Sequence, residues 1–392
     1  MLTSSDDLSR FCASVFASMA RHDQRRWGEV YVRGLVEVPG RKSVRRISES
    51  LLGRRADQSL QQFVNQSSWD WHPVRERIAH EVSAALAPRA LVVEEVVLPK
   101  SGRSSVGVAQ QFSQTLGRVL NCQLGLVVMA AGPVGVAPIN WRLLLPRSWD
   151  ADHDRRSRSR VPCHVRYRSR WHHLLDTLDE MTVDWRAKPL PVVVDASRSS
   201  SAVALIRGLE SRGLRYVVRV SCSTPLVRLA AGELVTVGER LARAGDSRGP
   251  AQHWRDNRAA GSRYSTVLLP DSGATCRARG VGFPHRTRRV MVEWGAEPNN
   301  VESAWITNVE SVRSSDVFEL LALWSQASRG LQRLGEQSGL RHFEGRSFRG
   351  WHHHVTLVSA AHAYELLGRL HGDGGGCAVS NRAAANKVES LQ

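Results

Sequence analysis

Lysine is scarce in a chain that is nevertheless strongly basic. Of the 54 cationic residues among 392, only four are lysines, and the other cations are all arginines. With 37 acidic residues, the formal net charge is +17 at pH 7. Preference for arginine is typical of a GC-rich coding sequence, but it does not explain the excess of cations over acids. This excess excludes an acidic disordered protein and predicts a polyanionic partner such as a nucleic acid.

Paired cysteines and long apolar runs are also missing. None of the six cysteines forms a C-x-x-C pair, and they are spread along the chain at positions 12, 122, 163, 222, 276 and 377. This spacing argues against a zinc ribbon and against a secreted disulfide framework. No segment approaches the roughly 20 apolar residues of a membrane-spanning helix, and the first residues are polar and acidic. We therefore expect a cytoplasmic protein with no membrane partner.

Hydrophobic periodicity divides the chain into five regions of different character. The first has apolar residues at helical spacing, the second alternates strand-like and helical runs, and the third is rich in Gly, Ser and Arg. The fourth is helical again, and the last contains little that could pack against a core. These regions are 1–86, a helical DNA-binding region; 87–220, the first part of an α/β core; 221–310, a β-rich insertion; 311–370, the C-terminal helices of the core; and 371–392, a flexible tail. Within them we expect strands at 105–112, 265–269, 289–294 and 303–308, an exposed loop at 150–170, and a helix that follows Trp351.

Two predicted strands end in acidic residues. A valine-rich run leads into Glu94 and Glu95, and a second leads into Asp195. A helix at 200–212 and a strand at 214–220 follow Asp195, and this strand–helix–strand unit implies parallel pairing. Carboxylates at neighbouring strand ends are the ligands of two-metal phosphoryl transfer, because they hold two Mg²⁺ ions about 3.5–4 Å apart. An acid after such a strand is also common as a helix cap or a solvated edge residue.

Basic residues gather on the predicted connections between helices and strands. Nucleic-acid-binding proteins use such residues to contact the phosphate backbone, although a solvated surface gives the same pattern. The candidate nucleic-acid-binding residues are Arg41, Lys42, Arg45, Arg46, Lys100, Arg103, Arg346 and Arg349.

Histidines and tryptophans in two segments have simpler structural explanations. The consecutive histidines at 352–354 point about 100° apart on a helix and cannot chelate one metal together. Trp69, Trp71 and Trp351 are of a type that stacks on bases, but packing in the core is the better interpretation.

Seven sequence blocks together resemble the IS701-type transposases of actinobacteria, which belong to the DDE group with an RNase H-like catalytic core. The resemblance covers about residues 10 to 368, and the blocks occur in the family's order. They are 23–35 (DQRRWGEVYVRGL), 61–71 (QQFVNQSSWDW), 98–108 (LPKSGRSSVGV), 117–123 (GRVLNCQ), 140–143 (NWRL) with 145–149 (LPRSW), 212–217 (RGLRYV) and 346–357 (RSFRGWHHHVTL).

The resemblance implies a fold, a partner and three catalytic acids. The fold is an α/β RNase H-like core with an N-terminal helical domain and a β-rich insertion. Double-stranded DNA is the implied substrate, Mg²⁺ the implied cofactor, and the nucleoid the implied location, with a homodimer left open. The first acid falls on Glu94, with Glu95 as a further metal ligand, and the second on Asp195. The third, normally a glutamate on a late helix, falls on Ser328.

These positions depart from the family pattern in ways that bear on catalysis. A glutamate in place of aspartate moves the carboxylate by roughly 1 Å, and misplacement of that size can cost about 10²-fold in rate. Ser328 offers a neutral hydroxyl where Mg²⁺ requires charge. No acid lies between Glu319 and Glu336. On an ideal helix Glu336 lies about 80° around from position 328, and Glu319 lies on the opposite face.

Three functions remain open on these residues. The first, which we prefer, is a transposase-derived DNA-binding protein, a pseudoenzyme with impaired or lost strand transfer. The second is an active DDE transposase that cleaves and joins DNA with Mg²⁺ through Glu94, Asp195 and an unidentified third acid. The third is a repurposed enzyme that acts on a small substrate in the acidic cleft.

Overall fold

The N-terminal region is a set of five helices, as the sequence predicts. The computed structural model describes residues 5–53, 56–228, 234–239, 241, 252–255, 263–268, 288–295, 301–309 and 314–385. The helices are α1 (Ser5–Val15), α2 (His22–Glu37), α3 (Val44–Leu52), α4 (Asp57–Asn65) and α5 (Trp71–Leu86). Ser43 caps α3 by accepting a hydrogen bond from the backbone N–H of Arg46, and Asp70 caps α5 in the same way through His72. Gly34 lets α2 approach Ile47 on α3, where a Cβ would lie 2.4 Å from the isoleucine side chain.

The second region forms a mixed β-sheet with the strand order of an RNase H-like core. Strands β1 (Ala90–Pro99), β3 (Arg118–Gly132) and β4 (Gly135–Leu144) form an antiparallel meander, with β2 (Ala109–Ser113) at the edge of β3. Strands β5 (Val192–Asp195) and β6 (Tyr216–Val220) run parallel to β1, joined by α8 (Ala202–Glu210). The parallel pairing expected from the strand–helix–strand unit is therefore confirmed.

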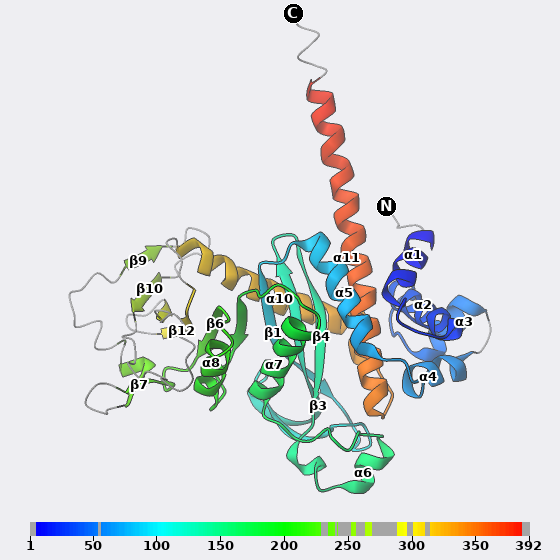
Figure 1. Cartoon of the computed structure of the whole chain (residues 1–392), viewed down its shortest axis with the longest axis horizontal. Coiled ribbons are helices and arrows are strands. Elements are labelled where there is room, and N and C mark those ends of the chain that lie inside the picture. The colour runs from blue at the N-terminus through cyan, green and yellow to red at the C-terminus, as the bar shows by residue number, and fades with distance from the viewer. Residues whose placement is uncertain are drawn as a thin grey trace, which may run out of the picture.

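The β-rich segment continues this sheet on the far side of β6. Strand β12 (Val301–Thr307) pairs antiparallel with β6, followed outward by β11 (Arg289–Trp294), β10 (Arg263–Leu268) and β9 (Gln252–Arg255). The separate pair β7 (Pro225–Arg228) and β8 (Leu234–Thr236) lies at the same end of the molecule (Figure 1). The three strands predicted between 265 and 308 correspond to β10, β11 and β12.

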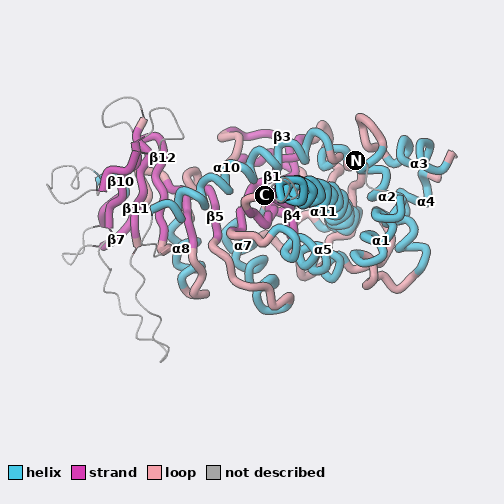
Figure 2. Tube along the Cα trace, turned by 90° about the horizontal axis from the view of Figure 1, so that it is seen from above, coloured by secondary structure: helices cyan, strands magenta, loops and turns pink. Residues whose placement is uncertain are grey.

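Helices cover both faces of the core sheet. Helix α10 (Ser314–Gln337) crosses one face, while α7 (Arg170–Asp179) and α8 cover the other (Figure 2). A π-helical turn, Glu180–Asp184, extends α7, and the 3₁₀ turn Leu340–His342 follows α10. Among the described helices, none combines the length and the apolar character that crossing a membrane requires.

Helix α11 (Phe348–Ala385) joins the N-terminal helices to the sheet. It packs on β4 and contacts α2, α4 and α5 as well. Residues 351–361 are all buried, so this part of the helix has no solvent-facing side. The helix begins near the predicted start and continues to Ala385, into the segment from residue 371 for which the sequence predicts a flexible tail.

Two loop predictions need correction. The strand expected from 105 to 112 begins only at Ala109, because Gly107 adopts φ +73°, a conformation outside any strand. The exposed loop expected at 150–170 contains the turn Arg147–Trp149 and helix α6 (His153–Arg158). Asp152 caps α6, and the buried Arg156 donates to the carbonyls of Pro162 and Val165, so these contacts order the segment.

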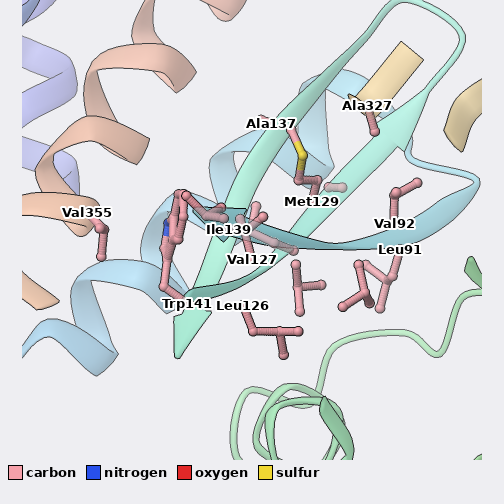
Figure 3. Packing of buried hydrophobic residues seen from close by; sticks show 14 of the residues in the cluster. Leu91, Val92, Leu126, Val127, Met129, Ala137, Ile139, Trp141, Ala327 and Val355 are labelled. Atoms are coloured by element: carbon pink, nitrogen blue, oxygen red, sulfur yellow. The ribbon is translucent and has the colours of Figure 1, made fainter. Parts of the chain in front are cut away.

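The hydrophobic core lies between the sheet and the helices on either face. Figure 3 shows Val127, Met129 and Ile139 from β3 and β4, with Ala327 of α10 beside Met129 and Val355 of α11 on the opposite side. Trp141 is fully buried there, and its indole N–H donates to Ser359 of α11 at 2.8 Å. The core therefore fixes α10 and α11 relative to the strands that carry the candidate site.

A fully buried arginine links α5, β4 and α11. The guanidinium of Arg75 donates to Thr356 Oγ1 and to the carbonyl of Trp141, both at 2.8 Å, and to the carbonyl of His352 at 3.2 Å. Burial lowers the pKa of Arg75 to about 9, and the charge of Arg142 lowers it as well, so the side chain stays protonated at neutral pH. Each of these buried acceptors would lose its partner without the guanidinium.

Replacing Arg75 with alanine should lower the free energy of unfolding by about 3 kcal/mol or more, because several buried polar groups lose their hydrogen bonds together. Denaturant unfolding followed by circular dichroism measures this change. The matched control is Arg77→Ala, which removes an exposed arginine of the same helix that pairs with Glu81 and should change stability by less than about 1 kcal/mol. Equal losses in the two variants would contradict a structural role for Arg75.

Candidate functional site

The carboxylates predicted at the two strand ends lie side by side. Val93 of β1 pairs with Val194 of β5, so the next residues along these parallel strands, Glu94 and Asp195, are neighbours. Asp195 ends its strand as predicted, but Glu94 and Glu95 do not, because β1 continues to Pro99. Glu94 and Asp195 line a cavity of about 800 Å³. The cavity opens at the carboxyl ends of the parallel strands, where functional sites of α/β sheets form.

Ser328 lies opposite Glu94 and completes the predicted trio of positions. Its hydroxyl donates a hydrogen bond to Glu94 Oε1 at 2.5 Å, from the middle of α10. Trp324 and Gly335, on the same face of the helix, line the cavity too. The sequence-based placement of position 328 at the site is thus matched by the geometry, and the side chain there is a neutral hydroxyl.

The surroundings of Glu94 favour the protonated form of its carboxyl group. Burial raises its pKa to about 7, and the charges of Asp195 and Glu95 act in the same direction. The hydroxyl of Ser328 partly opposes this shift by its hydrogen bond to the carboxylate. The indole N–H of Trp324 lowers the pKa as well, although it forms no hydrogen bond of full geometry. A substantial fraction of the protein therefore carries a protonated Glu94 at neutral pH.

Asp195 has both carboxylate oxygens engaged by its own chain. Its Oδ1 accepts hydrogen bonds from the backbone N–H and the hydroxyl of Ser197, at 2.8 and 2.6 Å. Its Oδ2 accepts from Arg219 Nη1 at 3.2 Å. Arg219 is the direct partner of Asp195 in the register of β5 with β6. The guanidinium lies 5.8 Å from the ring centres of Trp305 and Trp324, which hold it at the site.

Glu95 lies at the cavity but is bound away from the Glu94–Asp195 pair. Successive side chains of a strand point to opposite faces, so Glu95 turns from α10 toward α7. There its carboxylate pairs with Arg170 at 2.6 Å and accepts hydrogen bonds from Ser113 and from the backbone of Thr115. The structure therefore does not bring Glu95 together with Asp195 as the predicted metal ligand.

The residues of this cavity do not fit a pair of divalent ions. Within the described part of the chain, no group of three or more His, Cys, Asp or Glu side chains is placed to hold a metal. Glu319 pairs with Arg89 instead, and Glu336, which lines the cavity, accepts a hydrogen bond from Gln332 at 3.3 Å. Glu94 has the hydroxyl of Ser328 as its neighbour, and Asp195 has the guanidinium of Arg219. Neither group supplies a further negative charge for a metal ion.

The linker between α10 and α11, residues 338–347, contacts two other parts of the sequence that contain candidate nucleic-acid-binding residues. Arg41 contacts the linker through its ion pair with Glu344. The segment 100–106 reaches it through Lys100 Nζ, which donates to the carbonyl of Phe343, and through a backbone hydrogen bond from Val106 to Arg346. The exposed members of this basic surface are Arg41, Arg45, Arg46, Arg103, Arg346 and Arg349.

The two candidate lysines are placed differently from the arginines. Lys42 is buried and donates to the carbonyl of Val38. The prediction that it belongs to the exposed nucleic-acid-binding surface is therefore wrong. Lys100 is partly buried, with its ammonium on the carbonyl of Phe343. Burial lowers the pKa of both groups. Their backbones and side chains help to fold the linker, while the arginines face solvent.

The histidines at 352–354 and the tryptophans are parts of the core. The three histidines are buried, and their rings stack on or contact Trp71, Trp69 and Phe343. Trp69 and Trp351 are buried as well. The structural interpretation of these segments is therefore confirmed.

Sequence reasoning missed Arg219 and Arg170 as members of the site. A signal for Arg219 was present, since it is the one charged residue in the strand run YVVRV, and the parallel unit places that strand beside Asp195. Arg170 begins α7 and gave no comparable signal, because its contact with Glu95 depends on how the helix packs across the sheet.

Comparison with known proteins identifies the class to which this site belongs. The model of the family described as DDE superfamily endonuclease matches residues 14–267, which is more than half of the chain. The chain therefore belongs to the DDE superfamily of endonucleases, whose members act on DNA and generally use divalent ions such as Mg²⁺. The matched range contains Glu94 and Asp195 and ends before α10. No curated protein matches the chain.

The raised pKa of Glu94 gives a pH-dependent contribution to stability. The folded protein retains a proton that the unfolded chain loses above its ordinary value of 4.5, so stability should fall as the pH rises from about 4.5 through 7. Glu94→Gln removes this contribution while keeping an acceptor for Ser328. The variant should match wild type near pH 5 and exceed it by on the order of 1–3 kcal/mol at pH 8.5. Thermal unfolding at both pH values measures this, and a stability difference that is the same at both would contradict it.

Proposed function

We propose that the protein is a DNA-binding member of the DDE superfamily, of the IS701 type, in which strand transfer is severely impaired or lost. The observation that carries this proposal is the contact of Ser328 with Glu94, because it sets a neutral hydroxyl at the third position of the site. No other described carboxylate supplies a third ligand there. The protein would act by occupying DNA, as a regulator or as a partner of another protein.

The chemistry of DNA cleavage explains why this substitution matters. Two-metal transfer depends on carboxylates that hold the ions at a fixed spacing, so that one activates the attacking oxygen and the other stabilises the leaving oxygen. Mg²⁺ binds charged oxygen ligands in near-octahedral geometry and gives up water reluctantly. A hydroxyl at 328, a partly protonated Glu94 and an Asp195 that already binds Arg219 provide too little charge for that arrangement.

The basic surface around the linker before α11 supports DNA as the partner. Its exposed arginines lie just before and within α3, in the β1–β2 connection, in the linker and at the start of α11. The linker contacts residue 41 and the segment 100–106 directly. Arg341 belongs to the same linker and lines the cavity. A duplex on this surface would therefore have its backbone next to the candidate site, as expected for a DNA-binding protein of this family.

Purified protein should leave supercoiled plasmid and linear duplex uncut in both Mg²⁺ and Mn²⁺, while binding the same DNA in a mobility-shift assay. Ser328→Glu restores a third carboxylate and should produce metal-dependent nicking. Wild-type cleavage that Asp195→Asn abolishes would overturn the proposed loss of activity. That result would favour an active transposase, with Glu336 at the cavity as the first residue to test for the third acid.

The basic surface should set the salt dependence of DNA binding. Arg103→Ala and Arg346→Ala should each weaken binding to duplexes of unrelated sequence and reduce the slope of log K against log salt by about 1. Fluorescence anisotropy at several salt concentrations measures both quantities. Arg77→Ala, on α5, is the control and should leave the slope unchanged. If the control lowers the slope as much as the linker variants, the surface assigned to DNA is wrong.

A further inference from the structure

Arg219 places a permanent positive charge where the site would otherwise be strongly acidic. The residue lies on β6 beside Asp195, and their side chains form an ion pair with exposed fractions of 29% and 32%. Trp305 of β12 and Trp324 of α10 flank the guanidinium. Groups on β5, β6, β12 and α10 therefore fix the position of Arg219 at the cavity. An isolated ion pair on the surface would leave the side chain free to move.

The cavity as a whole has balanced charges. Its carboxylates are Glu94, Glu95, Asp195 and Glu336. Its guanidinium groups are equal in number, on Arg170, Arg198, Arg219 and Arg341. A site that contained only the carboxylates would repel a phosphate until metal ions neutralised it. Here the arginines already provide that neutralisation.

Arg219 retains donors that can reach a ligand. A guanidinium carries five N–H groups, and the hydrogen bond to Asp195 uses one of them. Among the residues that the structure describes, no second acceptor is bonded to Arg219. Planar guanidinium groups bind phosphate through paired N–H donors and need no metal to do so.

Arg341 supplies a second guanidinium on the α10 side of the cavity. Its Nε lies 3.1 Å from the point where a Cβ on Gly335 would stand, so the missing side chain of Gly335 makes room for it. Arg341 is exposed and lines the cavity, and it belongs to the linker between α10 and α11. Arg341 therefore connects the linker before α11 with the cavity.

We propose that this cavity binds a phosphate group of a DNA strand without a metal ion, with Arg219 and Arg341 as the groups that contact the phosphate. The proposal rests on the proposed function, because it assumes that DNA occupies the basic surface. The volume of about 800 Å³ is within the range of cavities that enclose small ligands, so a nucleotide or a strand end fits the site.

The test measures DNA binding in EDTA. Fluorescence anisotropy of a labelled oligonucleotide with a terminal phosphate reports the binding. Wild type should bind equally well in EDTA and in Mg²⁺ at matched ionic strength. Arg219→Ala and Arg341→Ala should each weaken binding about tenfold, as expected for the loss of a charge-assisted contact. Arg219→Lys keeps the charge but not the planar donors and should recover part of the affinity. A nucleoside monophosphate should compete if the site accepts free nucleotides, whereas competition by oligonucleotides alone assigns it to strands.

Two controls separate a direct contact from indirect effects. Arg212→Ala removes an arginine of similar exposure, 30%, which pairs with Asp179 away from the cavity, and it should leave affinity unchanged. The double variant Asp195→Asn with Arg219→Ala removes the ion pair entirely. If Arg219 contacts phosphate, the double variant stays weak, and if it recovers wild-type affinity, Arg219 only masks Asp195 and the proposal is overturned. Circular dichroism confirms that each variant is folded.

The outcomes also distinguish this inference from the proposed function. Wild type that does not bind DNA at all would remove the proposed function. Wild type that binds DNA while Arg219→Ala and Arg341→Ala bind equally well would overturn the inference alone. A requirement of wild type for Mg²⁺ in DNA binding would overturn it too, because the arginines would then not provide the needed charge.

Discussion

Carboxylates side by side on adjacent buried strands must have their charges compensated, and the means of compensation determines what this site can do. β-sheet pairing places Glu94 beside Asp195 whether or not an ion is present. In this protein a guanidinium pairs with one carboxylate and a hydroxyl bonds the other, while burial favours the protonated form of Glu94. Both carboxylates are therefore compensated by groups of the chain itself.

The site depends on how firmly α10 and the sheet are held together. Helix α10 packs directly on β1, β3, β4, β5 and β6, and α11 holds β4 against the N-terminal helices through its fully buried part, residues 351–361. The buried Arg75 adds hydrogen bonds that tie α5, β4 and α11 to one another. Helix α11 begins at the linker that collects the basic residues, so the element that stabilises the core also orders the surface assigned to DNA.

The sequence predicts the parts of the fold and site that depend on local patterns. The strand–helix–strand unit that begins with the Asp195 strand requires parallel pairing of β5 with β6, and the structure has this pairing. The pairing of β1 with β5, which places Glu94 beside Asp195, joins segments about 100 residues apart, and only the acidic residue that follows each valine-rich run indicates it. Counting along the late helix identifies Ser328 correctly at the cavity, because a helix keeps a fixed period over its length. Strand alternation also implies that Glu95 faces away from Glu94, so its proposed role as a metal ligand beside Asp195 conflicts with the period of the strand itself.

Other features depend on contacts between distant segments and have no local signal. The pairing of β12 with β6, which extends the core sheet, joins residues far apart in sequence. The burial of Lys42 follows from its contacts with Gly339 and His342, about 300 residues later in the chain, and no property of the basic cluster itself reveals it. The continuation of α11 past residue 371 contradicts the low helix propensity of the glycines there.

The most direct measurement of the central claim is a calorimetric titration of the wild-type protein with Mn²⁺ in the absence of DNA. Internal compensation of the carboxylates by Arg219 and Ser328 predicts no stoichiometric binding at micromolar concentrations of the ion. Binding of two ions per chain, abolished by Asp195→Asn, would show instead that the cavity holds the metal pair of an active DDE enzyme and would contradict the account.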